Sequence, residues 1–243
     1  MFIKKSIKRW LHPLVWERLG QAKQEFFWTK KNWHCDSILV PILEEYLNKK
    51  FGYYVEVGAN DGRSGSNTYH LEMSHGWSGV LVEPIMHLFF RSRQIRSLER
   101  NQFFNAACVS YDFKFPYVEL FYSGMMTASH SDSRVGDPEK WAREGSRFLS
   151  RGEIVQKTYS QARTLNSILV EANAPQVIDF LSIDVEGAEF SVLMGIDFNR
   201  FNFNFILIET PEDSPSHQFL LSMGYECVIV IAQNILFKLK NNS

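Results

Sequence analysis

Acidic and amide side chains follow several stretches of this sequence that read as buried strands. The first stretch, 53–58, runs into a tight, glycine-bearing turn. Two carboxylates, Glu56 and Asp61, lie in the stretch and in the turn. A turn that holds phosphate is cationic or neutral, so this acidic one suits a ligand with positive charge and free hydroxyls. The turn consists of Gly58, Ala59, Asn60, Asp61 and Gly62.

Glu83 indicates a nucleoside at the end of the next predicted strand. It follows Gly58 by 25 residues, and an acidic residue about 20 residues beyond such a turn can accept hydrogen bonds from ribose hydroxyls. The turn lacks the G-x-G-x-x-G pattern, because Asn60 stands where a second glycine would let backbone approach a pyrophosphate. S-adenosylmethionine fits these features better than a nicotinamide cofactor. An ordinary Asn-Asp-Gly turn is the structural alternative.

Polar residues also end the later predicted strands. Asn105 and Ala106 lie in the third strand, Asp184 and Glu186 follow the fourth, and Glu209 ends the fifth. In doubly wound sheets, ligands bind outside the carboxyl ends of the strands, where the strand order reverses. We therefore expect these groups on one rim of the molecule.

Transfer of a methyl group from S-adenosylmethionine to a hydroxyl would require a base, because the hydroxyl would have to lose a proton. Simple structural readings compete with the catalytic one: Glu186 can serve the start of a helix, and His130 lies in a serine-rich, polar segment. Carboxylates also suit Mg²⁺, but the sequence does not require a metal and we predict none. The candidate bases are Asp184, Glu186, Glu209 and His130.

Helix and strand patterns alternate through most of the chain, and the strands are apolar on both faces. This pattern predicts an α/β fold with a doubly wound, mostly parallel sheet. A hairpin, 225–232 and 234–240, closes the chain. Strands are expected at 53–58, 79–82, 103–109, 180–185 and 203–208, and helices at 38–47, 67–75, 85–98, 164–172, 188–194 and 214–222. An extra strand, 116–122, is expected to pair with 154–159, with a polar insertion at 124–153 between them.

Composition excludes several classes of protein. The 243 residues are 45% hydrophobic, enough for a sizeable core. A formal net charge of -1 argues against a nucleic-acid partner, which usually meets a basic excess. Three separated cysteines without a CxxC pair argue against a disulfide framework or a zinc site, so we expect a cytoplasmic protein.

Residues 1–34 differ from the rest of the chain, which we treat as one domain, 35–243. They hold eight Lys or Arg and two Glu, a net charge of +6 against −7 for the remainder. One reading is a basic amphipathic helix on an anionic membrane, at its inner face. The other is a helix that packs on its own domain or on a second subunit, as in a homodimer. The apolar residues at helical spacing are Ile3, Ile7, Trp10, Leu11, Leu14 and Val15.

Several ordered segments together resemble the FkbM family of S-adenosylmethionine-dependent methyltransferases. The resemblance covers roughly residues 50–210. It is carried by VEVGANDG at 55–62, SNT at 66–68, LE at 71–72, GWSG at 76–79, VEP at 82–84 and IDVEGAE at 183–189. It implies a seven-stranded sheet of the class I methyltransferase type with an antiparallel last strand, which fits the closing hairpin.

The resemblance also implies roles for residues around the cofactor. The turn at 58–62 would contact the methionine part, and Asn67 would lie near its carboxylate at a helix N-terminus. Glu83 would hold the ribose, and Asn105 and Ala106 would border the adenine.

Asp184 would face the methyl-transfer site in this resemblance. The activity implied is O-methylation of a hydroxyl on a saccharide, a lipid-linked glycan or a related natural product. The insertion at 124–153 is expected to form much of the acceptor pocket. Two alternatives stay open: a non-catalytic cofactor-binding or scaffold protein of the same fold, and a nicotinamide-dependent dehydrogenase.

Overall fold

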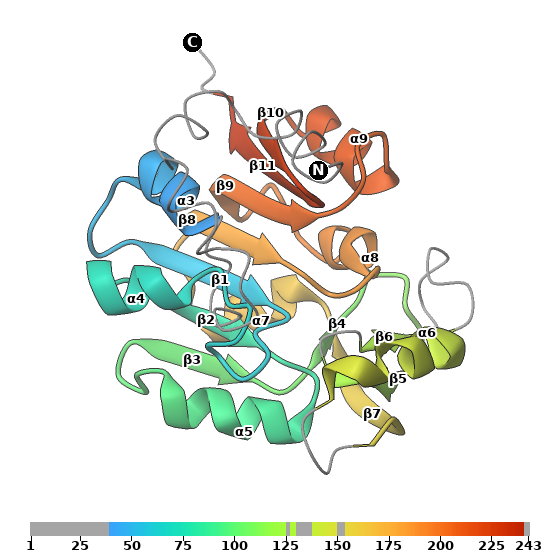
Figure 1. Ribbon diagram of the computed structural model, residues 1–243. Coiled ribbons are helices and arrows are strands. Elements are labelled where there is room, and N and C mark those ends of the chain that lie inside the picture. The colour runs from blue at the N-terminus through green and yellow to red at the C-terminus, as the bar shows by residue number, and fades with distance from the viewer. Residues whose placement is uncertain (1–38, 125–126, 130–137, 150–153, 241–243) are drawn as a thin grey trace, which may run out of the picture.

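Seven strands form the central sheet of the computed structural model, in the order β10-β11-β9-β8-β1-β2-β3 (Figure 1). The structure describes residues 39–124, 127–129, 138–149 and 154–240. The strands are β1 (Tyr53–Val57), β2 (Ser78–Val82), β3 (Asn101–Phe104), β8 (Val177–Ile183), β9 (Asn202–Glu209), β10 (Tyr225–Ile231) and β11 (Asn234–Leu239).

The five strands from β3 to β9 run parallel, whereas β11 is antiparallel to both of its neighbours. The predicted α/β sheet with an antiparallel last strand is therefore confirmed. The strand order reverses between β1 and β8, which pair directly at Val55 and Leu181. That reversal places the switch point of the sheet at the carboxyl ends of these two strands.

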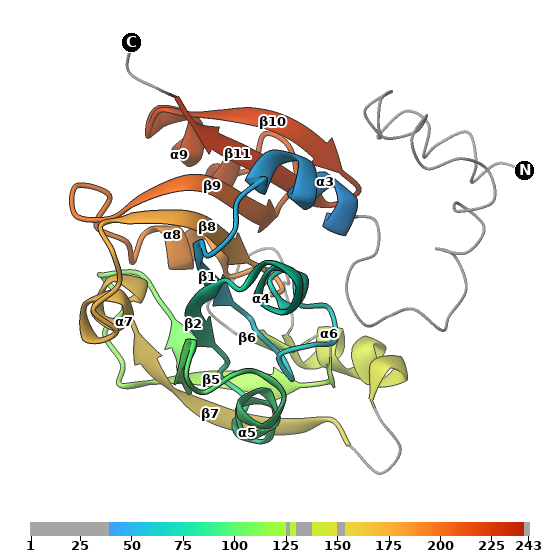
Figure 2. The same ribbon diagram turned by 90° about the vertical axis from the view of Figure 1, so that its left-hand side faces the viewer.

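Helices cover both faces of the sheet (Figure 2). The first layer contains α3 (Leu39–Leu47), α4 (Tyr69–His75) and α5 (Met86–Ile95). The second layer contains α7 (Leu165–Glu171), α8 (Glu189–Leu193) and α9 (Pro215–Ser222). Alternate residues of β1 serve the two layers: Tyr54 packs with α3 and α4, and Val55 and Val57 pack with α7 and α8.

Local signals in the sequence fix the ends of several helices. The Thr164 side chain accepts a hydrogen bond from the Ser167 amide and starts α7. Ser214 caps α9 in the same way, with Pro215 at the first helical position. Gly76 ends α4 in the left-handed conformation, at φ 70°.

A smaller sheet, in the order β4-β7-β5-β6, lies beside the switch point. Its strands are β4 (Ala107–Cys108), β5 (Tyr117–Tyr122), β6 (Ala128–Ser129) and β7 (Gln156–Arg163), and α6 (Pro138–Gly145) follows β6. The predicted pairing of 116–122 with 154–159 is confirmed by the antiparallel β5 and β7. The single strand predicted at 103–109 is wrong: β3 ends at Phe104, and after two residues the chain joins the smaller sheet as β4.

The amphipathic segment 1–34 lies outside the described residues, so its helix and its membrane contact stay predictions. Among the helices that the structure does describe, none combines the length and the apolar character needed to cross a membrane.

Candidate active site

A cavity lies at the carboxyl ends of β1, β2 and β8, between the central sheet and the smaller sheet. Its empty space, including the open mouth, is about 960 Å³. The predicted site residues that line it are Gly58, Asn60, Glu83, Ala106, Asp184 and Glu186. The cavity therefore gathers residues from four separate predicted strand ends.

Glu83 follows the last residue of β2 and is 5% exposed. Its Oε2 accepts a hydrogen bond from the Asn60 amide at 2.8 Å, and its Oε1 accepts one from the Ile85 amide at 2.7 Å. Burial, with the Asp61 charge adding to it, raises the pKa of Glu83 to about 7, although the two amides oppose the shift. Each carboxylate oxygen keeps a second lone pair for a ligand hydroxyl.

Gly58 and Asp184 bring the ends of β1 and β8 into close contact. Gly58 has φ 89°, and a Cβ atom built there would lie 1.8 Å from the Asp184 carbonyl oxygen. The Asp184 amide in turn donates to the Val57 carbonyl at 3.1 Å. A glycine is therefore required for the backbone of the turn to cross the switch point.

Asp184 and Glu186 both line the cavity. Glu186 has φ 53°, a left-handed conformation that costs energy for a residue other than glycine. Burial, followed by the charge of Asp184, raises the pKa of Glu186 to about 8. This carboxyl group can therefore gain or lose a proton near neutral pH.

Apolar residues form another part of the cavity lining. Ile85 and Leu88 contribute from the start of α5, and Val118 and Leu120 contribute from the inner face of β5. Sequence reasoning did not include these residues in the site. The alternation of apolar residues in 118–122 was the available signal, since it marks one buried face of the extra strand.

The structure places Glu56 outside the cavity, in contrast to the sequence-based expectation. Strand alternation points Glu56 toward the α4 layer, on the same side as Tyr54. The buried carboxylate accepts hydrogen bonds from Ser66 Oγ, from the Asn67 amide at 2.8 Å and from Thr68 Oγ1 at 2.8 Å. Glu56 therefore holds the segment that leads into α4.

The acidic group of the turn, Asp61, is also absent from the cavity lining. Its carboxylate accepts from the Ser64 amide at 2.6 Å and from Ser64 Oγ at 2.9 Å. Ala59 is fully buried in the core, and its carbonyl accepts from the Gly62 amide at 2.8 Å. Asp61, Ala59 and Gly62 thus shape the turn, while Asn60 and Gly58 present it to the cavity.

The two amide side chains that were predicted to lie near the cofactor form hydrogen bonds within the protein. Asn67 Nδ2 donates to Ser182 Oγ at 3.0 Å, and its Oδ1 is buried without a hydrogen-bond partner. Asn105 Nδ2 donates to the carbonyls of Glu83 and Pro84 at 2.8 and 3.0 Å. Asn105 therefore fixes the end of β2, and Ala106 beside it lines the cavity.

Two of the four predicted bases are not part of the described cavity. Glu209 ends β9 and pairs with Asn234 of β11, on the far side of β8 from the turn. His130 lies outside the described residues. The structure thus brings together Asp184 and Glu186 as candidate bases.

Comparison with known proteins identifies the family of this chain. The profile of the methyltransferase FkbM domain matches residues 56–227. No curated protein matches the chain. One similar solved structure is the METTL16 MTase domain, with 9% identity, 84% of this chain and 67% of that chain covered, and a TM-score of 0.41.

A second similar structure is the human methyltransferase 10 domain containing protein, with 11% identity, coverage of 82% of this chain and 78% of that chain, and a TM-score of 0.34. The FkbM match extends from Glu56 in β1 to Cys227 in β10, so it includes the cavity and most of the sheet. The chain therefore belongs to the FkbM family of methyltransferases.

Proposed function

We propose that this protein is an S-adenosylmethionine-dependent O-methyltransferase that acts on a hydroxyl of a saccharide or lipid-linked glycan. The observation that carries the cofactor assignment is Glu83, a buried carboxylate that two backbone amides hold at the cavity. Its remaining lone pairs suit the two hydroxyls of a ribose. Bound there, S-adenosylmethionine would supply an electrophilic methyl group on a sulfonium.

The residues of the cavity fit this cofactor in charge and shape. Asp184 carries a negative charge, and Glu83 and Glu186 can each lose a proton near neutral pH, which suits a sulfonium and an ammonium group. Ile85 and Leu88 offer an apolar wall that suits an adenine ring. Gly58 allows the turn that borders the cavity to pass close to the Asp184 carbonyl, where a Cβ atom would collide.

We assign the role of base to Glu186. A general base is most effective when its pKa lies near the working pH, and the pKa of Glu186 is raised to about 8. Its carboxylate would take the proton of the acceptor hydroxyl as the oxygen attacks. Asp184 would assist this proton transfer, because its negative charge raises the pKa of Glu186 and so makes it a stronger base.

The acceptor is expected to enter beside the insertion. Gly124 and Thr127 border the same cavity as Glu186, so the insertion reaches the reacting end of the site. Long loops on a rigid sheet commonly determine which substrate an enzyme accepts. A neutral hydroxyl-bearing group suits a site whose nearest charges are carboxylates.

Two measurements test the proposal. Calorimetry with S-adenosylmethionine and S-adenosylhomocysteine should show binding to the full chain, and Glu83→Ala should weaken it at least tenfold, the loss of one charged hydrogen-bonding partner. An absence of binding, or equal binding by Glu83→Ala, would refute the cofactor assignment. Methyl transfer to a panel of saccharides then tests the enzyme itself, since a scaffold protein would bind the cofactor without turnover.

A further inference from the structure

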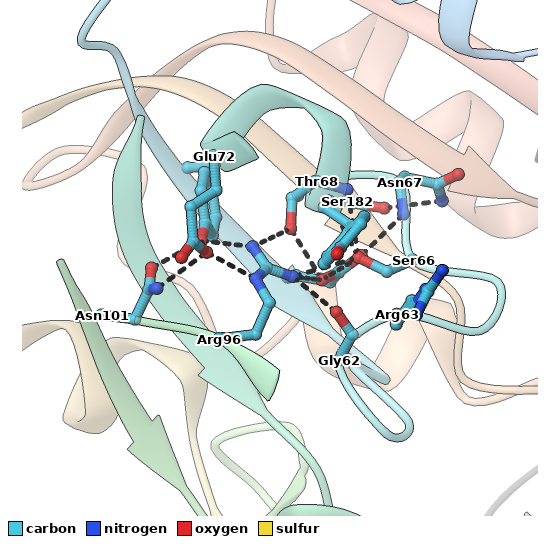
Figure 3. Close-up of polar contacts among 12 residues, drawn as sticks. Gly62, Arg63, Ser66, Asn67, Thr68, Glu72, Arg96, Asn101 and Ser182 are labelled. Atoms are coloured by element: carbon cyan, nitrogen blue, oxygen red, sulfur yellow. Dashed lines mark hydrogen bonds and ion pairs between the residues drawn. The ribbon is translucent and has the colours of Figure 1, made fainter. Parts of the chain in front are cut away.

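A buried arginine, Arg96, contacts the chain segment that follows the turn at 58–62, as Figure 3 shows. Arg96 follows α5 and is 3% exposed. Its Nη1 donates to the Gly62 carbonyl at 3.0 Å and to Ser66 Oγ at 3.2 Å, and its Nη2 donates to Thr68 Oγ1 at 3.0 Å. Nε donates to Glu72 of α4. One side chain therefore holds three points of the segment 62–68 and joins it to α4.

Glu56 holds the same segment from the strand side. It accepts hydrogen bonds from Ser66 and Thr68, and its Oε2 lies 3.6 Å from Arg96 Nη1. Ser66 and Thr68 thus bond to both the carboxylate and the guanidinium. Such shared groups make the cluster cooperative, because removing one member leaves others buried without partners.

Gly62 shows how closely the segment lies on α5. It has φ 81°, and a Cβ atom there would lie 2.9 Å from Ser92 Cβ and 3.0 Å from Arg96 Cγ. The turn is therefore pressed against the helix that carries Arg96.

The segment 62–68, which Arg96 and Glu56 hold, also contributes to the cavity lining. Ser64 and Gly65 line the cavity, between the anchored residues Gly62 and Ser66. Asn60, two residues before Gly62, donates its amide to Glu83. The position of the cavity wall and of the Glu83 partner therefore both depend on the cluster formed by Arg96, Glu56 and Glu72.

We propose that Arg96 is a positioning residue for the cofactor, which fixes the segment 62–68 in its binding conformation before the cofactor arrives. The inference rests on the proposed function, since it names a determinant of the same site. A segment held in the competent conformation binds with its full affinity, whereas one that samples several conformations binds in proportion to its competent fraction.

The geometry of the guanidinium is essential to this role. Its planar fork reaches acceptors in several directions, whereas a lysine ammonium has three donors on a flexible stem. Arg96→Lys keeps the charge that Glu56 and Glu72 require but loses most of the contacts to the segment. Arg93→Lys, an exposed change on the same helix, is the matched control.

The test measures binding of S-adenosylhomocysteine by calorimetry, well below the unfolding temperature of each variant. We expect Arg96→Lys to raise Kd by about tenfold or more, equivalent to the loss of one or two hydrogen bonds, and Arg93→Lys to leave it unchanged. Hydrogen exchange of the amides of 62–68 should be faster in Arg96→Lys without ligand and should slow when ligand is added. A purely structural role would lower stability and leave the Kd of the folded fraction at the wild-type value.

A second pair of variants decides the question if Arg96→Lys does not fold. Ser66 and Ser160 are each 3% exposed. Ser66 Oγ contacts Glu56 and Arg96, whereas Ser160 Oγ has no hydrogen-bond partner. Ser66→Ala should weaken binding of S-adenosylhomocysteine severalfold, and Ser160→Ala should not.

The outcomes separate this inference from the proposed function. If the wild-type chain binds no S-adenosylhomocysteine, the proposed function fails. If the wild type binds and Ser66→Ala and any folded Arg96→Lys bind equally well, the positioning role is wrong. A loss of turnover with unchanged Kd would also overturn it.

Discussion

Glu83→Gln should make the protein more stable at alkaline pH and less able to bind the proposed cofactor, S-adenosylmethionine. The pKa of Glu83 is raised from 4.5 to about 7. The folded state therefore keeps a proton that the unfolded state releases, and wild-type stability falls as pH rises from about 4.5 to about 7. The difference between these two pKa values corresponds to about 3 kcal/mol of stability.

Glutamine at this position does not titrate, so the variant lacks this loss. Its amide nitrogen would face one of the two backbone N–H groups that now donate to Glu83, at a cost of about 1–2 kcal/mol. The variant should thus be less stable than wild type by about 1–2 kcal/mol at pH 4.5 and more stable by about 1–2 kcal/mol at pH 8.

Urea titrations followed by tryptophan fluorescence at pH 4.5 and 8 measure this crossing. Glu226→Gln, an exposed change on β10, is the control and should follow wild type at both values. Calorimetry at pH 8 should show weaker binding of S-adenosylmethionine by Glu83→Gln. A stability difference between Glu83→Gln and wild type that stays constant with pH would show that Glu83 is not a destabilising buried acid.

Three further predictions follow from the site. Because the pKa of Glu186 is raised to about 8, kcat/KM should increase with pH up to about pH 8. Glu186→Gln should lower kcat/KM by about 10²–10⁴-fold and remove this increase with pH. A pH profile that is the same in Glu186→Gln and wild type would exclude Glu186 as the base. Gly58→Ala should cost more than about 3 kcal/mol of stability in urea titrations, because its Cβ would meet the Asp184 carbonyl. The control Gly224→Ala, at a similar φ of 87° and with no atom within 4 Å of the added Cβ, should cost about 1 kcal/mol. Equal costs for the two variants would contradict the close approach of Gly58 to Asp184. Deleting residues 1–34 should abolish sedimentation with anionic vesicles if that segment is the predicted membrane contact.

Most strands and helices of the central sheet were predictable because their determinants are local. Alternating helical and strand patterns, glycine turns and the closing hairpin each appear within a few residues. Glu83 and Asp184 were also predictable as site residues, since both directly follow apolar strands whose carboxyl ends meet at the switch point. For such positions, the end of the strand is enough to place the residue at the rim of the sheet.

Side-chain direction within a strand or turn was harder to predict. Glu56 lies one residue before the end of β1, and the pleat turns it toward α4, where an arginine 40 residues away in sequence is its counter-ion. Asp61 is used by Ser64 within the turn itself. Acidic charge in a turn therefore indicated a polar site but did not show which carboxylates face the ligand.

The break between β3 and β4 also escaped the sequence pattern. Residues 103–109 are mostly apolar and read as one strand, but Asn105 donates its amide to the carbonyls of Glu83 and Pro84. This contact ties the chain to the end of β2, and Ala107 then pairs with Ala162 in the smaller sheet. Only tertiary contacts reveal such a change of sheet.

The pairing of β4 with β7 has a consequence for how this enzyme can diversify. Cys108 lies opposite Arg163, so the chain departs from the methyltransferase core and returns to it at neighbouring positions. The segment between these two residues therefore begins and ends at adjacent positions, an arrangement that tolerates replacement and changes in length. Under the proposed function, we therefore expect replacement of this segment to change the acceptor, while β1, β2 and β8, whose ends border the cavity, stay unchanged.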